Sequence, residues 1–264
     1  MPAHSAAARR LDPLSVLGEL LITLGVIVGL FAVYEVWWTN VEAKQEQQAA
    51  EDRLRQQWSD ENPRPLTGPQ DGSAIARLYI PSFGSDFSFA VVEGVTQADL
   101  ARGPGHYPDT AQAGEPGNFA LAGHRVGRGA PFNDLGLLHS CDAIVVETAG
   151  SWNVYRVLPI DTPARQAGQV AAGCLPQPAA GAATSGAYAD VNGRSITNPQ
   201  DVEVVNPVPG QPRSAAQPGD LPLLTLTTCH PQFSNKERMI VHAVLARHDL
   251  KSPGYIPPEL TGGA

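Results

Sequence analysis

A cysteine and an arginine stand at the two ends of a short connection between apolar, β-branched runs. Cys229 ends the run LTLTT (224–228), and Arg238 opens the next run. Because adjacent antiparallel strands joined this tightly bring the end of one beside the start of the other, we expect the two side chains to be neighbours. A guanidinium near a thiol favours the thiolate and can also donate fixed hydrogen bonds to an anion.

A histidine far away in the sequence completes a candidate catalytic set. His124 follows the apolar run NFALA (118–122), and the exit of a strand into a loop is a common place for a functional histidine. Cys229, His124 and Arg238 would then serve thiol acyl transfer as nucleophile, general acid/base and clamp for an oxyanion or substrate. Each has an ordinary alternative, namely an inert buried thiol, a structural histidine and a solvent-facing arginine.

The amino-acid composition restricts the fold class and the kinds of binding partner that are expected. The 264 residues include 26 Gly and 24 Pro, which disfavours a helical bundle and favours a loop-rich, all-β body. The length fits one domain with appendages, or two small domains. A net charge of −8 disfavours a surface that tracks phosphates, so no nucleic acid is expected as a partner.

One long apolar segment lies near the N-terminus. Residues 16–38 read VLGELLITLGVIVGLFAVYEVWW, which as a helix would be about 34 Å long and able to cross a bilayer. The alternative is a cleaved signal peptide, but the apolar region is longer than a typical signal core and no clean A-x-A site follows it. Arg9 and Arg10 precede the span, which predicts a cytoplasmic N-terminus and an extracytoplasmic body in a single-pass cell-membrane protein.

This segment divides the chain into five predicted parts. They are a cytoplasmic N-terminus (1–15), a transmembrane helix (16–38), an extracytoplasmic stalk and linker (39–72), a catalytic domain (73–249) and a C-terminal tail (250–264). The stalk begins with a helix-forming stretch without a continuous apolar stripe and ends in an extended segment rich in Pro, Gly and Asp. An unpaired thiol outside the cytoplasm risks oxidation, so retention of Cys229 there favours a functional role.

The body reads as short strands separated by turn residues. About eight strands in this length favour a closed or nearly closed antiparallel barrel. Residues 96–102 open with an N-capping threonine and predict one short helix, whereas the Ala/Gly/Pro-rich segment 162–200 is long for a plain loop and could hold another. The predicted strands are 75–80, 87–93, 118–122, 143–148, 152–160, 202–205, 223–229 and 238–245.

Two stretches of the body resemble a known family. TLTTCHPQFSNKERMIVHAVL (225–245) is similar to the signature of sortases, the membrane-anchored cysteine transpeptidases of Gram-positive cell surfaces. GHYPDTAQAGEPGNFALAGHR (105–125), followed by GAPFNDL (129–135), is similar to a second part of that signature. The anchor helix, the trailing W-W-T-N and the TLTTCHP form look most like class E, the actinobacterial group, over roughly residues 75–247.

The resemblance implies a fold and a reaction. The fold would be an eight-stranded sortase β-barrel with short helices, in which Cys229 is the nucleophile, His124 the general acid/base and Arg238 the residue that binds the signal backbone and stabilises the oxyanion. Thr228 matches a position that helps to place the substrate. The thiol would cleave a Leu-Ala-x-Thr-Gly-like sorting signal of a surface protein between Thr and Gly, form a thioacyl enzyme, and transfer the acyl group to an amine of a peptidoglycan precursor or a pilin. The alternative is a membrane-tethered β-barrel binding or adaptor module with a vestigial site.

One position departs from the class E pattern. Such sequences often carry H-R-x-x-Y-G-A-P-F, and Arg128 stands here where that tyrosine would be. The tyrosine is associated with the choice of the second signal residue. Arg128 could therefore contact a more polar or acidic signal, or it could be an exposed loop arginine.

The remaining cysteines and histidines receive structural interpretations. Cys141 and Cys174 lie outside the family motif on the oxidising side of the membrane, and we expect them to form a disulfide that would close a loop of about 34 residues. His230 is the alternative base, but neighbouring strand residues point to opposite faces. The sequence predicts no cofactor and no metal site, since no Cys/His spacing fits zinc and no acidic cluster fits calcium.

Overall fold

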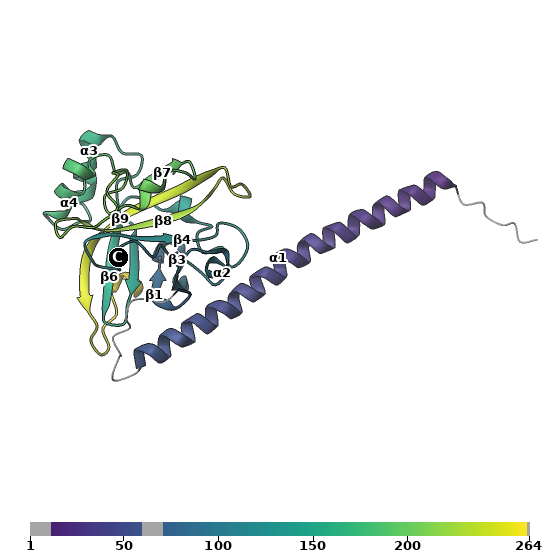
Figure 1. Ribbon diagram of the computed structural model, residues 1–264, viewed down its shortest axis with the longest axis horizontal. Coiled ribbons are helices and arrows are strands. Elements are labelled where there is room, and N and C mark those ends of the chain that lie inside the picture. The colour runs from purple at the N-terminus through teal and green to yellow at the C-terminus, as the bar shows by residue number, and fades with distance from the viewer. Residues whose placement is uncertain (1–11, 60–70, 263–264) are drawn as a thin grey trace, which may run out of the picture.

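The structure, a computed structural model, describes residues 12–59 and 71–262 and consists of a β-barrel with one long helix that runs away from it (Figure 1). The strands are β1 (Ala74–Tyr79), β2 (Ser88–Glu93), β3 (Gly105–His106), β4 (Gly117–Ala122), β5 (Ala143–Glu147), β6 (Ser151–Val157), β7 (Arg194–Thr197), β8 (Pro222–His230) and β9 (Glu237–Leu250). The α-helices are α1 (Pro13–Ser59), α2 (Gln97–Leu100), α3 (Ala164–Ala172) and α4 (Ala179–Ala182).

Eight strands close the predicted barrel. They follow the order β6-β5-β1-β2-β3-β4-β8-β9, and pairing of β6 with β9 joins the ends, while β7 adds to the outside of β9 as a ninth strand. The barrel is not wholly antiparallel as expected, because β2 pairs with β3 and β4 pairs with β8 in parallel. A parallel pair requires a long crossover, and the residues between β4 and β8 supply it.

The core forms where alternate strand residues point inward. Leu224 and Leu226 of β8 are fully buried against Phe119 and Leu121 of the parallel neighbour β4. The opposite face of β8 is also covered, since Leu223 packs in a second cluster with α3 and α4 residues such as Ala171 and Ala180. The segment 162–200 therefore forms a helical cover over one side of the barrel, and it also contains β7. Its Ala/Gly/Pro-rich composition predicted neither the two helices in full nor the strand.

The strand predicted at 202–205 is wrong, because Val202–Val205 forms a short 3-10 helix. The β-branched residues there find no partner strand, and Val202 is largely exposed. Helix α2 is confirmed. A capping box begins it, in which the side chains of Thr96 and Asp99 each accept from the backbone amide of the other residue.

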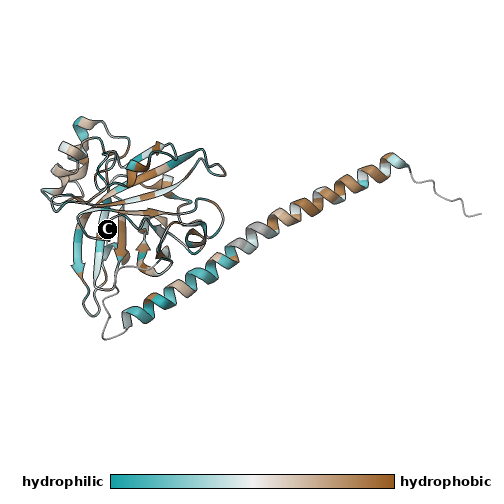
Figure 2. Ribbon diagram, in the orientation of Figure 1, coloured by the Kyte–Doolittle hydropathy of each residue, from teal (hydrophilic) through white to brown (hydrophobic). Residues whose placement is uncertain are grey.

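Helix α1 is longer than the predicted span. Its apolar part, Pro13–Tyr34, is long enough to cross a membrane, and the helix continues without a break to Ser59. Figure 2 shows the change from hydrophobic to hydrophilic residues along it. The expectations for Arg9, Arg10 and the extended linker fall on residues 1–11 and 60–70, outside the part of the chain that the structure describes.

The first half of the expected stalk differs from a free spacer, because it packs against the barrel. Ala50 and Leu54 are buried with Ala74 and Ala90 of β1 and β2. Ala50, Leu54 and Trp58, spaced by four residues, form the helix side of this contact, and polar residues fill most of the positions between them, so the apolar stripe is narrow. Helix α1 therefore combines an apolar part long enough to cross a membrane with a second part that packs against the barrel.

Candidate active site

Two of the three predicted catalytic residues lie on neighbouring strands, and the third follows the end of a strand beside them. Cys229 of β8 is paired directly with Arg238 of β9, as the short connection predicts. On its other side β8 runs parallel to β4, with Ala122 opposite Thr227. His124 and Cys229 each follow that pair by two residues, and a step of two keeps side chains on one face. The strand register thus pairs Cys229 with Arg238 and puts the exit of β4, with His124 two residues beyond its end, next to the Cys229 end of β8.

Backbone and hydroxyl contacts hold the exit of β4 against β8. The amide of Gly123 donates to the carbonyl of Thr227 at 3.0 Å, and the Thr228 hydroxyl donates to the carbonyl of Gly123 at 2.8 Å. A Cβ at Gly123 would lie 2.5 Å from the Phe132 ring, so only glycine fits between the ring and β8. These contacts fix the peptide that leads into His124.

His124 combines partial burial with a free ring nitrogen. Burial is the main cause that lowers the pKa of His124 below its ordinary value, and the positive charge of Arg128 lowers this pKa further. Its Nε2 is buried and has no hydrogen-bond partner among residues 12–59 and 71–262. An unpartnered buried nitrogen costs free energy, so its presence favours a partner that arrives with a ligand.

Cys229 and Arg238 share a neighbour that sequence reasoning missed. The half-buried Cys229 Sγ lies 3.4 Å from Oδ1 of Asn235 in the β8–β9 connection. One guanidinium nitrogen of Arg238 donates to the Asn235 carbonyl at 3.4 Å and to the Glu237 carbonyl at 2.9 Å. The other guanidinium N–H groups remain available for an anion. Asn235 lies between the two motif residues in sequence, but its role depends on how the connection folds.

His230, the alternative base, is engaged elsewhere. Its Nδ1 lies 2.6 Å from Nη1 of Arg125, which also donates to the Cys229 carbonyl at 3.4 Å. Arg125 cannot give up its charge, so Nδ1 of His230 accepts this hydrogen bond. His230 is thus held by Arg125, whereas the buried Nε2 of His124 has no partner in the described residues, and Arg125 is a second site residue that the sequence analysis did not assign.

Arg128 lies beside helix α1 as well as near His124. Its exposed side chain lines a cavity of about 240 Å³ together with Glu42 and Glu46 of the helix and Arg102. The predicted contact of Arg128 with a sorting signal remains a hypothesis, and the acidic neighbours present in the structure are those of the chain's own helix.

Cys141 and Cys174 form a disulfide in the structure, with Cα atoms 5.6 Å apart. The amide of Cys141 also donates to the carbonyl of Val157 in β6 at 2.9 Å. The bridge thereby ties the end of α3 to the barrel wall at β5 and β6.

Two further histidines belong to the core. His106 is buried with its Nδ1 2.8 Å from Glu93, and His242 lies 2.8 Å from the Thr225 hydroxyl. In the ranges that the structure describes, no group of three or more His, Cys, Asp and Glu residues lies close enough together to hold a metal ion.

Comparison with known proteins agrees with this geometry. The family model described as a sortase domain matches residues 78–246. Sortases SrtE1 and SrtE2 of Streptomyces coelicolor are 33% and 31% identical over 90% and 93% of this chain, which spans 58% and 87% of their lengths.

Solved structures extend the likeness to the fold. The SrtF sortase of Corynebacterium diphtheriae is 56% identical with a TM-score of 0.72, over 75% of this chain and 97% of that one. Sortase E of Streptomyces avermitilis is 32% identical with a TM-score of 0.51, over 72% of this chain and 99% of that one. The predicted likeness to class E is consistent with these relatives. A closed eight-stranded barrel, the two motifs and a family model that covers most of the chain lead to one conclusion: this chain belongs to the sortase family.

Proposed function

We propose that this protein is a membrane-anchored cysteine transpeptidase that cleaves a sorting signal between Thr and Gly and passes the acyl group to an amine. The pairing of Cys229 with Arg238 on β8 and β9, together with the position of His124 just after the neighbouring strand β4, carries this proposal. Membership of the sortase family supports it, and so does sortase E1 of Streptomyces coelicolor, which is 30% identical to this chain and whose crystal structure holds a tripeptide in the active site.

The first half-reaction uses all three side chains. The Cys229 thiolate attacks the carbonyl carbon of the Thr–Gly bond, and the Arg238 guanidinium donates to the oxyanion that forms. Protonated His124 then gives its proton to the departing glycine amine, the C–N bond breaks, and a thioester with Cys229 remains. Nε2 of His124 supports this role, because it has no hydrogen-bond partner among the described residues and can carry that proton.

The second half-reaction reverses the proton transfers. Neutral His124 accepts a proton from the incoming amine as that amine attacks the thioester, and Cys229 leaves as the thiolate. We propose a Leu-Ala-x-Thr-Gly-like signal on surface proteins as donor, and a peptidoglycan precursor or pilin amine as acceptor.

The proposed orientation of the protein in the membrane depends on α1. We propose that its apolar part crosses the cell membrane with the N-terminus in the cytoplasm, and that residues 73–249 form the extracytoplasmic catalytic unit. Labelling of Cys229 in intact cells with a membrane-impermeant maleimide tests this orientation, and labelling only after lysis would contradict it.

The deciding experiment is covalent capture. The full chain in detergent is incubated with a Leu-Ala-x-Thr-Gly peptide, and the thioester is located by mass spectrometry while cleavage is followed in parallel. We expect an adduct on Cys229 and cleavage that is lost in Cys229→Ala but retained when Cys141 and Cys174 are both changed to Ser. Equal peptide turnover by the chain and its Cys229→Ala variant would overturn the transpeptidase, and peptide binding without any turnover would favour the adaptor module instead.

A further inference from the structure

The loop that follows His124 has an unusual backbone. Four consecutive residues, Gly127, Arg128, Gly129 and Ala130, have φ values of 67°, 50°, 76° and 38°. This left-handed region costs a residue with a Cβ roughly 1–2 kcal/mol, a cost that applies here to Arg128 and Ala130. Such a turn persists only where its surroundings hold it.

Part of what holds this turn lies in the loop itself. The Ala130 amide donates to the Gly127 carbonyl at 2.8 Å and closes the turn, and the Phe132 amide donates to the carbonyl of His124 at 3.1 Å. The second bond connects the turn to the backbone of the proposed acid/base. A change in the turn is therefore transmitted directly to the position of His124.

The rest of what holds it comes from helix α1. The Gly129 amide donates to Oδ1 of Asn40 at 3.2 Å, across 89 residues of sequence. One helical turn further on, Ala43 is only 3% exposed and would lie 3.7 Å from a Cβ placed at Gly129. Helix α1 thus contacts the turn at Gly129, between the two strained residues Arg128 and Ala130.

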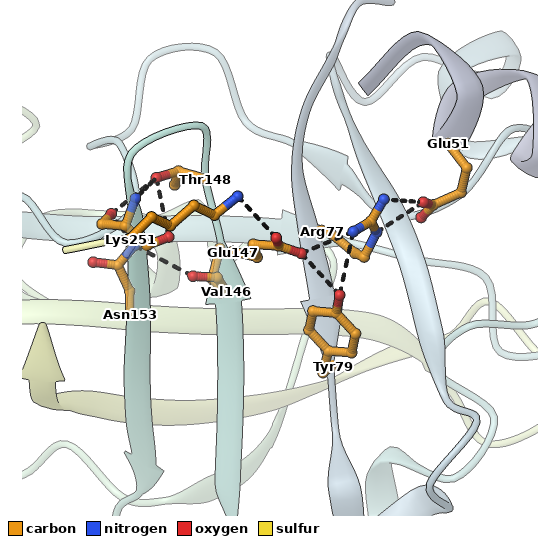
Figure 3. A network of polar contacts seen from close by, with 9 residues as sticks. Glu51, Arg77, Tyr79, Val146, Glu147, Thr148, Asn153 and Lys251 are labelled. Carbon is orange, nitrogen blue, oxygen red and sulfur yellow. Dashed lines mark hydrogen bonds and ion pairs between the residues drawn. The ribbon is translucent and has the colours of Figure 1, made fainter. Parts of the chain in front are cut away.

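Helix α1 is itself fixed to the barrel at further positions C-terminal to Asn40. The Gln47 side chain accepts from the Ala90 amide at 2.9 Å and donates to the Ala90 carbonyl at 3.1 Å, and it also donates to the carbonyl of Arg102. Further along, Glu51 binds Arg77 of β1, which binds Glu147 of β5 at 2.8 Å (Figure 3). Asn40 is therefore presented by a helix whose position is set by the barrel.

We propose that Asn40 is a positioning residue for His124, which acts by holding the 127–130 turn from the membrane-anchored helix. The inference rests on the proposed function, since it assigns the turn a role in the reaction of His124. It extends the active site to the anchor helix, which would then be part of the catalytic unit as well as an attachment to the membrane.

The test compares Asn40→Ala, Asn40→Asp and Gln45→Ala in the full chain reconstituted in vesicles. Asn40 is exposed and Ala is the stronger helix former, so Asn40→Ala is expected to fold. Asp keeps an oxygen that can accept from Gly129, and the exposed Gln45 lies on the same helix as a matched control. Two readouts are taken, namely kcat and KM for the signal peptide, and hydrogen exchange of the 126–132 region with β2 as an internal reference.

We expect Asn40→Ala to lower kcat about tenfold with little change in KM, and to accelerate exchange in the turn but not in β2. Asn40→Asp should recover most of kcat, and Gln45→Ala should equal the parent chain. If the parent cleaves peptide and Asn40→Ala matches it in kcat and exchange, the inference fails while the proposed function stands. If the parent and Cys229→Ala are equally inactive, the proposed function fails, and the inference that rests on it fails as well.

Discussion

The Thr228 hydroxyl links the nucleophile strand to the strand that leads to His124. It donates to the carbonyl of Gly123, and both groups are buried. Thr228→Val keeps the shape of the side chain but leaves that carbonyl without its donor, at a cost of roughly 1–3 kcal/mol. Thr228→Ser keeps the hydroxyl and serves as the control.

We therefore expect Thr228→Val to lower both the free energy of unfolding and kcat, whereas Thr228→Ser stays close to the parent in kcat. Denaturant titration gives the first quantity, and peptide cleavage gives the second. A Thr228→Val variant with unchanged kcat would show that the contact serves stability alone.

Arg128 provides an electrostatic prediction for His124. Its charge lowers the pKa of His124, so Arg128→Gln should raise that pKa and keep the imidazolium present to higher pH. Because the proposed reaction requires the imidazolium, the limb of the pH–kcat/KM profile set by loss of this proton should move to higher pH, by about half a unit or less. The profile of the exposed Arg165→Gln variant, on α3, is the control.

Added salt should move the parent profile in the same direction as Arg128→Gln, since it screens the same charge. A limb that stays in place in both experiments would mean that Arg128 does not influence the proton on His124. A change confined to KM would instead support the predicted contact of Arg128 with the signal.

The residue scale also shows what sequence could predict about the site. Cys229 and Arg238 are placed by a short hairpin, and His124 by the family motif, so all three follow from local patterns. Asn235, Arg125 and Asn40 do not, because their contacts depend on the conformation of connections and on a helix docked from far away in sequence. No spacing rule brings Asn40 to Gly129.

Among the elements, the helical cover between β6 and β8 depends on the disulfide. Cys141 and Cys174 close a loop of about 34 residues, for which the chain-entropy model gives roughly 3–4 kcal/mol. Changing both to Ser in a Cys229→Ala background should lower the free energy of unfolding by about that amount. Hydrogen exchange should accelerate mainly in α3 and α4.

Thiol titration checks the bridge directly. The denatured parent chain without reductant should expose one thiol, Cys229, and three after reduction. Three thiols before reduction would show that the bridge is not formed in the isolated protein.

Element prediction succeeded where a segment carries its own pattern. Strands with β-branched residues and a helix opened by an N-cap were placed from sequence, whereas β3 is only two residues long and β7 forms because β9 offers it an edge. The run at 202–205 has strand-like residues but no partner strand and becomes a 3-10 helix. Pairing partners, which sequence patterns do not specify, decided these cases.

At the scale of the whole molecule, the proposed topology makes α1 the element that sets the distance of the candidate site from the membrane. Asn40 follows the apolar part of the helix by six residues, from Tyr34 onward, which is about 9 Å of helix rise. In the proposed topology, the turn beside His124 therefore lies close to the headgroups. A substrate held in the same membrane would reach the candidate catalytic side chains without a long extension.

The barrel as a whole should lose stability in acid through His242. This buried side chain has a pKa lowered to about 4 by burial, against an ordinary value near 6.5. As the pH falls, His242 takes up its proton in the unfolded chain before it does so in the folded chain. The contribution of His242 to the free energy of unfolding is therefore complete above pH 6.5 and declines between pH 6.5 and 4. The integrated loss is about 3 kcal/mol.

His242→Asn tests this without removing the polar contact, because an amide N–H can replace Nδ1–H toward Thr225. The variant should show a shallower fall of the unfolding free energy between pH 6.5 and 4 than the parent, with the exposed His139→Asn as the matched histidine control. Equal slopes for His242→Asn and the parent would show that His242 does not cause the acid sensitivity. A shallower slope would assign this part of the acid sensitivity of the barrel to His242 of β9.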